Sequence, residues 1–293
     1  MEQTIKRAGA ETAPGTLYLC ATPIGNLEDM TYRAVRILGE VPLIAAEDTR
    51  HTRQLLTHFG ISTRLTSYHE HNKAEKGPEL IAWLLSGNDL ACVSDAGLPG
   101  IADPGAQLAA EAIAAGVRVV PLPGANAALS ALIASGLDTT RFSFVGFLPR
   151  TKEKRRACLA EVAARRETLI FYEAPHRLEE TLSVLLDALG DRPAAWAREL
   201  TKKFEEFCRG RLSELLARCG ENPPRGEFVI VVGGAEDAEE TAPSFSAEDV
   251  VQLVRSMMQD GMGKKDAMRE AAKRANLSRR AVYQLMLEEE GKV

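Results

Sequence analysis

The sequence has few cysteines, and their spacing excludes two common classes of protein. Its 293 residues include 5 cysteines, an odd number, and they are widely spaced with no C-x-x-C pair. Disulfide frameworks use even sets of cysteines, and zinc sites use closely spaced pairs. His69 and His71 are the nearest pair of histidines, but they lack the H-E-x-x-H pattern of a zinc hydrolase and indicate solvated surface. We therefore expect free cysteines and no metal site.

Long apolar runs and nucleotide-binding loops are also missing. No stretch approaches the roughly 20 apolar residues of a membrane-spanning helix. Residues 1–14 contain Lys6 and Arg7 but no apolar core of a signal peptide. We therefore expect a cytoplasmic protein without a membrane partner. No G-x-x-x-x-G-K-[ST] loop is present, and no G-x-G-x-x-G follows the first predicted strand, which disfavours P-loop and dinucleotide-binding proteins.

What the sequence does contain is a repeated alternation of strands and helices. Strands are predicted at 16–21, 43–46, 90–94 and 117–121, with helices at 29–38 and 127–135 among them. A second series has strands at 142–146, 168–172, 194–198 and 227–232, with helices at 152–165, 177–189 and 211–219. The alternation in the first series is typical of a mostly parallel sheet covered on both faces, and the second series predicts a second α/β unit.

The predicted fold class is α/β, with two α/β domains and a small all-helical C-terminal tail. The domains are expected at 16–137 and 138–234, after a flexible N-terminus at 1–15. An acidic linker at 235–243 leads to the tail at 244–293, with helices at 246–258, 264–274 and 279–289. Asn276 and Ser278 provide a turn and a cap before the last helix.

Glycine and proline gather just after the predicted strands of the first domain. Ligands of open α/β sheets bind beyond the carboxyl ends of the strands. One such loop indicates nothing more than a tight turn, but four at one sheet edge favour a binding cleft. The residues concerned are Gly25, Gly97, Gly100, Gly105, Gly124, Pro23, Pro99, Pro104 and Pro123.

Charge is unevenly distributed along the chain. The formal net charge is -5, yet residues 141–234 carry 17 Lys and Arg against 14 Asp and Glu. Residues 261–285 of the tail carry 7 against 2, and residues 264–283 resemble a helix-turn-helix, although such a tail also suits domain packing. Basic clusters of this kind contact RNA phosphates. The alternative interpretation of such a cluster is a solvated helix face. The RNA-binding candidates are Lys152, Lys154, Arg155, Arg156, Arg198, Lys202 and Lys203.

Seven segments resemble the tetrapyrrole methylase superfamily, and within it the branch that methylates small-subunit ribosomal RNA. They are ATPIGNLED at 21–29, EDTR at 47–50, SDAGLPGIADPG at 94–105, PLPG at 121–124, FYEAPHR at 171–177, RELTK at 198–202 and GEFVIV at 226–231. The resemblance implies a homodimer of two-domain chains with S-adenosylmethionine in a cleft between the domains. The branch implies 2′-O-methylation of a cytidine in the decoding region of 16S ribosomal RNA.

The resemblance also implies which residues meet the cofactor. They are Pro23, Gly25, Asp95, Gly97, Ile101, Ala102, Asn126, Ala127, Tyr172, Ala197 and Glu227. Ala102 stands where the branch usually has serine, a change that leaves a backbone contact intact.

The catalytic base is left open by the sequence. A ribose hydroxyl must lose a proton as it attacks the methyl group, and the candidates are Asp95, Asp103, Glu47, Asp48, His51 and Lys202. Two of these candidates have an alternative structural role of equal weight: Asp103 as a helix cap, and Asp48 as an ion-pair partner of Arg50. Two other functions stay open: a methyltransferase for a porphyrin-like ring, and an RNA-binding assembly factor without catalysis.

Overall fold

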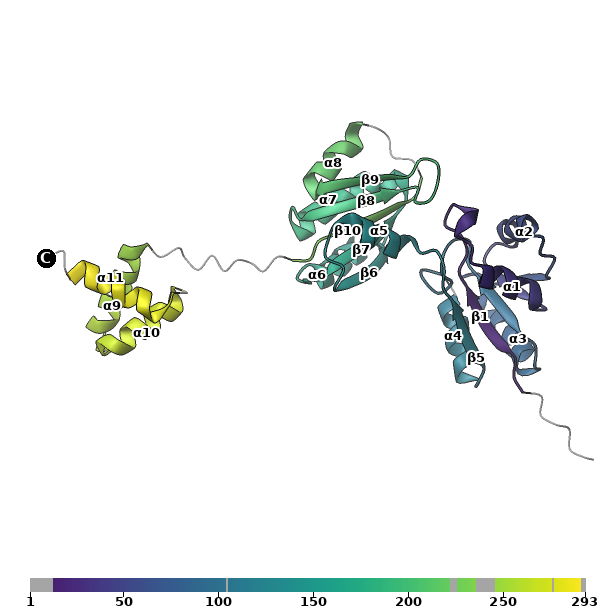
Figure 1. Cartoon of the computed structure of the whole chain (residues 1–293), viewed down its shortest axis with the longest axis horizontal. Coiled ribbons are helices and arrows are strands. Elements are labelled where there is room, and N and C mark those ends of the chain that lie inside the picture. Colours follow the sequence, from purple (N-terminus) through teal and green to yellow (C-terminus); the bar gives the residue numbers. More distant parts are fainter. Residues whose placement is uncertain (1–12, 104, 222–225, 236–245, 276, 291–293) are drawn as a thin grey trace, which may run out of the picture. The chain divides into compact units, whose positions relative to one another are not determined.

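The computed structural model describes residues 13–103, 105–221, 226–235, 246–275 and 277–290. Two compact units are present, Met1–Gly234 and Ala235–Val293. The first unit contains two five-stranded sheets, each with its own helices (Figure 1). Within the described residues no helix has the length and apolarity needed to cross a membrane.

The first sheet has the order β3-β2-β4-β1-β5, and its pairings are parallel. Its strands are β1 (Thr16–Cys20), β2 (Ile44–Ala46), β3 (Leu65–Ser67), β4 (Leu90–Val93) and β5 (Arg118–Leu122). Helices α1 (Tyr32–Glu40) and α2 (Thr49–His58) cover one face, while α3 (Lys73–Leu85) and α4 (Gly105–Ala114) cover the other. This buries β2 and β4 completely, as expected for a parallel sheet.

The strand order creates a crevice at one edge of this sheet. From β1 the chain crosses to β2 on one side, whereas from β4 it crosses to β5 on the other side of β1. Ligands of open α/β sheets bind where successive connections diverge in this way. The loop after β1, which includes the short helix η1 (Leu27–Asp29), and the loop after β4 are therefore the positions to inspect.

The second sheet has the order β6-β7-β10-β8-β9 and is mixed. Its strands are β6 (Phe142–Phe147), β7 (Thr168–Glu173), β8 (Pro193–Arg198), β9 (Glu206–Arg211) and β10 (Phe228–Val232), with β6 and β7 parallel and the other pairings antiparallel. One face is covered by α6 (Lys152–Val162), α7 (Leu178–Leu189) and α8 (Leu212–Glu221). The short helix η2 (Pro175–Arg177) leads into α7.

Helix α5 (Ala127–Ser135) covers the opposite face of the second sheet, although the sequence places it in the first domain. Its bounds agree with the prediction: the Asn126 side chain accepts a hydrogen bond from the backbone N–H of Leu129 at 2.8 Å, and Gly136 ends the helix with φ 83°. However, Ala131 and Leu132 pack against β10. The chain therefore passes from the first sheet to the second before α5. The glycine that ends α5 does not mark the boundary between the sheets, because burial decides which sheet a helix covers.

The second unit is a three-helix bundle whose bounds agree closely with the prediction. Helices α9 (Ala247–Gln259), α10 (Lys264–Arg274) and α11 (Arg279–Glu290) enclose a core that includes Val254, Ala271 and Val282. Ser246 forms a reciprocal capping box with Asp249, and the Ser278 hydroxyl accepts from the backbone N–H of Ala281 at 3.1 Å. Asn276, residues 1–12 of the predicted flexible N-terminus and residues 236–243 of the predicted linker lie outside the described residues.

Candidate functional site

A cavity of about 540 Å³, here called the large cavity, is lined by loops from both sheets of the first unit. Loops after β1, β2, β4 and β5 contribute one side, and the ends of β6, β7, β8 and β10 with their loops contribute the other. Its volume lies in the range of roughly 300–1,000 Å³ usual for small-molecule sites. The predicted cofactor residues that line it are Gly97, Ile101, Ala102, Asn126, Ala127, Tyr172 and Glu227.

The remaining predicted cofactor residues lie elsewhere. Pro23, Gly25 and Asp95 line a neighbouring cavity of about 250 Å³, here called the side pocket. Ala197 is buried under α5, in the same cluster as Val229. Ala197 lines neither cavity because the side of β8 that carries it is covered by the helix that the sequence assigns to the other domain.

Backbone strain is concentrated beside the large cavity. In the described part of the chain, the non-glycine residues with positive φ are Ala102 at 68°, Glu199 at 49° and Thr201 at 66°. Ala102 and Glu199 line the large cavity, and Thr201 lies between the lining residues Leu200 and Lys202. Such conformations cost about 1–3 kcal/mol each and persist where the surrounding structure holds them, commonly at functional sites.

The loop after β8 is held by an ion-pair network. The Glu199 carboxylate accepts hydrogen bonds from Lys202 Nζ at 3.0 Å and from the backbone N–H of Glu227 at 3.2 Å. Although burial acts in the opposite direction, the contact with Glu199 raises the pKa of Lys202. Lys202 therefore stays protonated near neutral pH and is unsuited to accept a proton. Its aliphatic stem lies where a Cβ at Gly25 would be, so this position has no room for a side chain.

Carboxylates join the loop after β4 to the start of α2. Glu47 Oε2 accepts from the backbone N–H of Asp95 at 3.2 Å, and Asp95 Oδ1 accepts from the backbone N–H of Asp48 at 3.1 Å. Burial, followed by the charges of Asp95 and Asp103, raises the pKa of Glu47. Glu47 is thus a carboxylate in the large cavity with an increased affinity for a proton.

Asp103 and Asp48 both occupy the structural roles that the sequence left open for them. Asp103 Oδ1 accepts from the backbone N–H groups of Gly100 at 2.6 Å and Gly105 at 2.8 Å, which caps the start of α4, while burial raises the pKa of Asp103. Asp48 caps α2 and forms a two-point pair with Arg50, at 3.1 and 2.7 Å. The hydrogen bonds from Arg50 hold the pKa of Asp48 far below its usual range.

Aromatic rings form one apolar wall of the large cavity. Phe147 and Tyr172 both line it, with ring centroids 5.6 Å apart in an edge-to-face contact. Phe144 contacts the same tyrosine at 5.0 Å, and burial raises the pKa of Tyr172. The wall is therefore an apolar aromatic surface beside polar loops, which suits a ligand with an aromatic ring.

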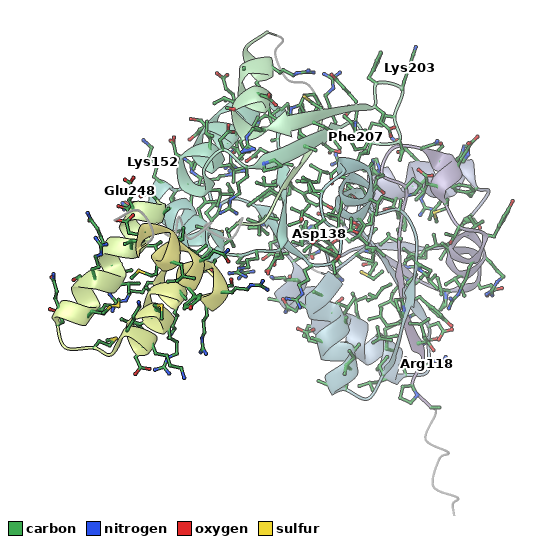
Figure 2. All side chains as sticks on the ribbon, turned by 60° about the vertical axis from the view of Figure 1, so that its left-hand side comes forward. Arg118, Asp138, Lys152, Lys203, Phe207 and Glu248 are labelled. Atoms are coloured by element: carbon green, nitrogen blue, oxygen red, sulfur yellow. The ribbon has the colours of Figure 1, made fainter. Side chains whose placement is uncertain are left out.

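The predicted RNA-binding residues divide into exposed and engaged groups. Lys152, Lys154 and Arg156 are exposed on α6, whereas Arg155 is buried and pairs with Glu180 of α7 at 2.7 Å. We therefore no longer count Arg155 among the RNA-binding candidates, because its guanidinium group forms an ion pair between two packed helices. Arg198 pairs with Glu206 at 2.9 Å. Lys203 is exposed on the loop after β8 and points away from the sheet (Figure 2).

Other residues of the large cavity were not predicted from the sequence. They include Ile24, Phe147, His176, Glu199 and Val229. His176 and Glu199 lie inside the segments 171–177 and 198–202 that carry the family resemblance. Their position in these segments, just after predicted strands, could have indicated that they line a site. Phe147 has no such signal, because only the fold brings the end of β6 beside Tyr172.

Comparison with known proteins identifies the family of this chain. The family model described as Tetrapyrrole (Corrin/Porphyrin) Methylases matches residues 16–216. A protein of Halalkalibacterium halodurans named Ribosomal RNA small subunit methyltransferase I is 49% identical over 94% of this chain and 96% of its own length. Proteins of the same name from Bacillus subtilis and Synechocystis are each 50% identical, covering 92% and 94% of this chain and 93% and 98% of their own lengths.

A solved structure supports the same fold. Uroporphyrin-III-C-methyltransferase from Thermus thermophilus superposes with a TM-score of 0.54 at 23% identity, covering 75% of this chain and 94% of its own. The chain therefore belongs to the tetrapyrrole (corrin/porphyrin) methylase family, in the branch of the proteins named ribosomal RNA small subunit methyltransferase I.

Proposed function

We propose that this protein transfers a methyl group from S-adenosylmethionine to small-subunit ribosomal RNA, at the 2′-oxygen of a cytidine in the decoding region of 16S RNA. Methyl transfer and the class of RNA are carried by the near-full-length similarity to the ribosomal RNA methyltransferases. The cytidine and its 2′-oxygen come from the resemblance of the sequence motifs. The cytoplasm is the proposed place of action.

The large cavity fits this cofactor in charge as well as in size. Its lining carboxylates, Glu47, Asp103, Glu173, Glu199 and Glu227, outnumber its cation Lys202. S-adenosylmethionine carries a net positive charge from its sulfonium and ammonium groups, so a cavity with negative potential attracts it. We assign the apolar wall of Phe147 and Tyr172 to the adenine, and the glycine-rich loop around Gly97 to close backbone contacts.

Glu47 is our choice for the proton acceptor. When bound, the cofactor supplies a methyl group that is already electrophilic, so the protein must orient the ribose oxygen and take its proton. Lys202 is held protonated, Asp48 is engaged by Arg50, and Asp103 caps α4. Glu47 lines the large cavity with a raised pKa, and its carboxylate is fixed by the backbone of Asp95.

Exposed basic residues form the proposed contact with RNA. Lys203 lies next to the cavity-lining Lys202, and Phe204 beside it is 67% exposed, which combines a phosphate contact with a stacking ring. In the second unit, exposed basic residues lie on two helices: Lys265 and Lys273 on α10, and Arg279 and Arg280 on α11. We propose that both regions bind phosphates of the ribosomal particle.

We also propose a homodimer. Leu129 and Ile133 of α5 are 44% and 77% exposed, and Phe142 of the edge strand β6 is 43% exposed. Large apolar side chains in such numbers mark interaction surfaces. The molar mass in solution tests this proposal: Ile133→Arg is expected to shift the mass from that of two chains to that of one.

The decisive experiment is methyl transfer from isotopically labelled S-adenosylmethionine to small ribosomal subunits that lack the modification. Label is expected on a ribose of 16S RNA, at one cytidine, in nuclease digests analysed by mass spectrometry. Label on a base or at another nucleotide contradicts the proposed position. Label on a porphyrin-like ring in place of RNA, or no transfer despite RNA binding, supports one of the two other functions left open by the sequence.

A further inference from the structure

The side pocket, next to the large cavity, has no role in the function proposed so far. It has a volume of about 250 Å³ and is lined by the loop after β1, the start of α2 and Asp95. We propose that it holds the nucleobase of the RNA residue that receives the methyl group. This inference rests on the proposed function, because it assigns the acceptor of the same reaction.

Adjacent residues of two loops line different cavities, so the two cavities share these loops as walls. Ile24 lines the large cavity, whereas its neighbours Pro23 and Gly25 line the side pocket. In the loop after β4, Asp95 lines the side pocket, while Ser94 and Ala96 on either side of it line the large cavity. A nucleotide with its base in the side pocket is therefore held next to the large cavity, where its ribose is close to the proposed methyl donor.

The shared wall is held by contacts on both sides. The paired hydrogen bonds of Glu47 with the Asp95 backbone, and of Asp95 with the Asp48 backbone, tie the loop after β4 to α2. On the other side, the stem of Lys202 packs against Gly25. A fixed wall matters because transfer requires the acceptor oxygen in line with the methyl group, and a displacement of 1 Å can cost about 100-fold in rate.

The lining of the side pocket combines apolar and polar side chains, as a nucleobase site requires. Its inner part contains Thr22, 3% exposed, and Leu55, 9% exposed, with the partly exposed Leu27 beside them. Its polar residues are His51, Gln54 and Asp95. Apolar surface packs on the base, whereas an amide and a carboxylate bond to its edge. For cytosine, a carboxylate accepts from the exocyclic amino group and the Gln54 amide donates to a ring acceptor.

Cations on α2 supply the phosphate contact that a bound nucleotide needs. The Arg50 side chain is 88% exposed even while paired with Asp48, and it lies next to the pocket residue His51. Arg53 is exposed beside the pocket residue Gln54. Arginine contacts to phosphate position a nucleic acid without reading its sequence, so the base edge is left to Gln54 and Asp95.

The test fills the side pocket with a larger side chain and compares a matched variant. Leu27→Trp fills it, and Leu85→Trp is the control, because Leu27 is 41% exposed in the side pocket while Leu85 is 44% exposed on α3 and lines neither cavity. Leu27→Trp is expected to reduce kcat/KM for the ribosomal subunit about 100-fold. It is also expected to weaken binding of a short single-stranded RNA with the target cytidine. S-adenosylmethionine affinity, measured by calorimetry, is expected to match that of Leu85→Trp.

A second variant tests recognition of the base edge. Gln54→Leu keeps the approximate volume but loses the amide, and it is expected to reduce the preference for RNA with cytidine over RNA with uridine at the target position by about tenfold. This variant decides the question if Leu27→Trp also disturbs cofactor binding, because Gln54 lies on α2 away from the shared loops.

The outcomes separate this inference from the proposed function. If wild-type protein transfers no methyl group to ribosomal RNA, the proposed function fails, and the RNA-binding measurements still test the side pocket. If Leu27→Trp binds RNA and transfers methyl groups as Leu85→Trp does, and Gln54→Leu retains full preference for cytidine, the side pocket does not hold the base.

Discussion

At the scale of single residues, the carboxylate of Glu47 combines a position in the large cavity with a raised pKa. Replacing it by glutamine removes the proposed proton acceptor and keeps the shape, so kcat is expected to fall by about 100-fold or more while cofactor binding persists. A carboxylate base works only when deprotonated. In the wild type, kcat is therefore expected to fall as the pH decreases toward the pKa of Glu47, which lies above the ordinary value of 4.5.

Rate measurements across pH for the wild type and Glu47→Gln check this assignment. The variant is expected to lose the acidic decline in kcat because it lacks the titrating group. A variant that keeps both the wild-type rate and the acidic decline would assign the proton to another acceptor, with His51 of the side pocket as the next to test.

Gly97 gives a second prediction at this scale. It lines the large cavity with φ 80°, and Gly116 offers a matched control with φ 77° and open space around it. Any side chain at either position strains the backbone, but Gly97→Arg also fills the large cavity. Calorimetry in the presence of a metal chelator is expected to show no binding of S-adenosylmethionine to Gly97→Arg and normal binding to Gly116→Arg. Equal affinities would remove Gly97 from the cofactor site.

At the scale of elements, the loop after β8 separates two roles in adjacent lysines. Lys202 lines the large cavity within the Glu199 network, whereas Lys203 is exposed. Lys203→Ala is expected to lower the slope of log affinity for RNA against log salt by about 1 and to leave cofactor affinity unchanged. Lys203→Arg, which keeps the charge, serves as the control. In contrast to Lys203→Ala, Lys202→Ala is expected to weaken cofactor binding.

Fluorescence titrations with RNA at several salt concentrations measure these slopes. An unchanged slope for Lys203→Ala would mean that this lysine belongs to the solvated surface. If Lys202→Ala leaves cofactor affinity unchanged, the ion-pair network supports the loop without affecting the cofactor.

Local sequence signals predicted some elements well and others poorly. The tail helices were predicted because apolar periodicity and the caps at Ser246 and Ser278 agree. Strands β3 and β9 were not predicted. β3 has three partly buried residues, and β9 contains three charged residues and a glycine but only one buried residue, Cys208. The antiparallel pairings of the second sheet also escaped prediction, because alternating strands and helices do not specify strand direction.

The candidate functional site was also predicted only in part. Loops rich in glycine and proline after β4 and β5 could be placed in a cleft, because parallel strands bring their carboxyl ends to one edge. Whether Asp95 lines the large cavity or the side pocket could not be predicted, since adjacent residues of one loop line different cavities. The position of Ala197 depends on α5, whose packing is a tertiary property.

At the scale of the whole molecule, the second unit is expected to be separable. Its core residues, including Val250 and Met286, form a cluster of their own, and β10 completes the second sheet before the chain leaves the first unit. A chain that ends at Gly234 is therefore expected to fold and bind S-adenosylmethionine normally but to methylate ribosomal subunits slowly.

Circular dichroism, calorimetry and transfer assays on the same truncated protein measure these three properties. A full-length variant with glutamine at Lys265, Lys273, Arg279 and Arg280 is the matched control, because it keeps the bundle and removes four charges. Equal losses in both proteins assign the effect to charge. Wild-type transfer by the truncated protein would exclude a role for the second unit in RNA binding, and failure to fold would make that unit structural.

The crossing of α5 to the second sheet has a consequence for synthesis of the protein. Ala128, Ala131 and Leu132 are synthesised before any strand of the sheet that buries them. The first sheet can form early, but α5 keeps an uncovered apolar face until β10 is translated. Chaperone binding and aggregation of nascent chains are therefore expected to concentrate in this interval, when the ribosome is between the codons for α5 and β10.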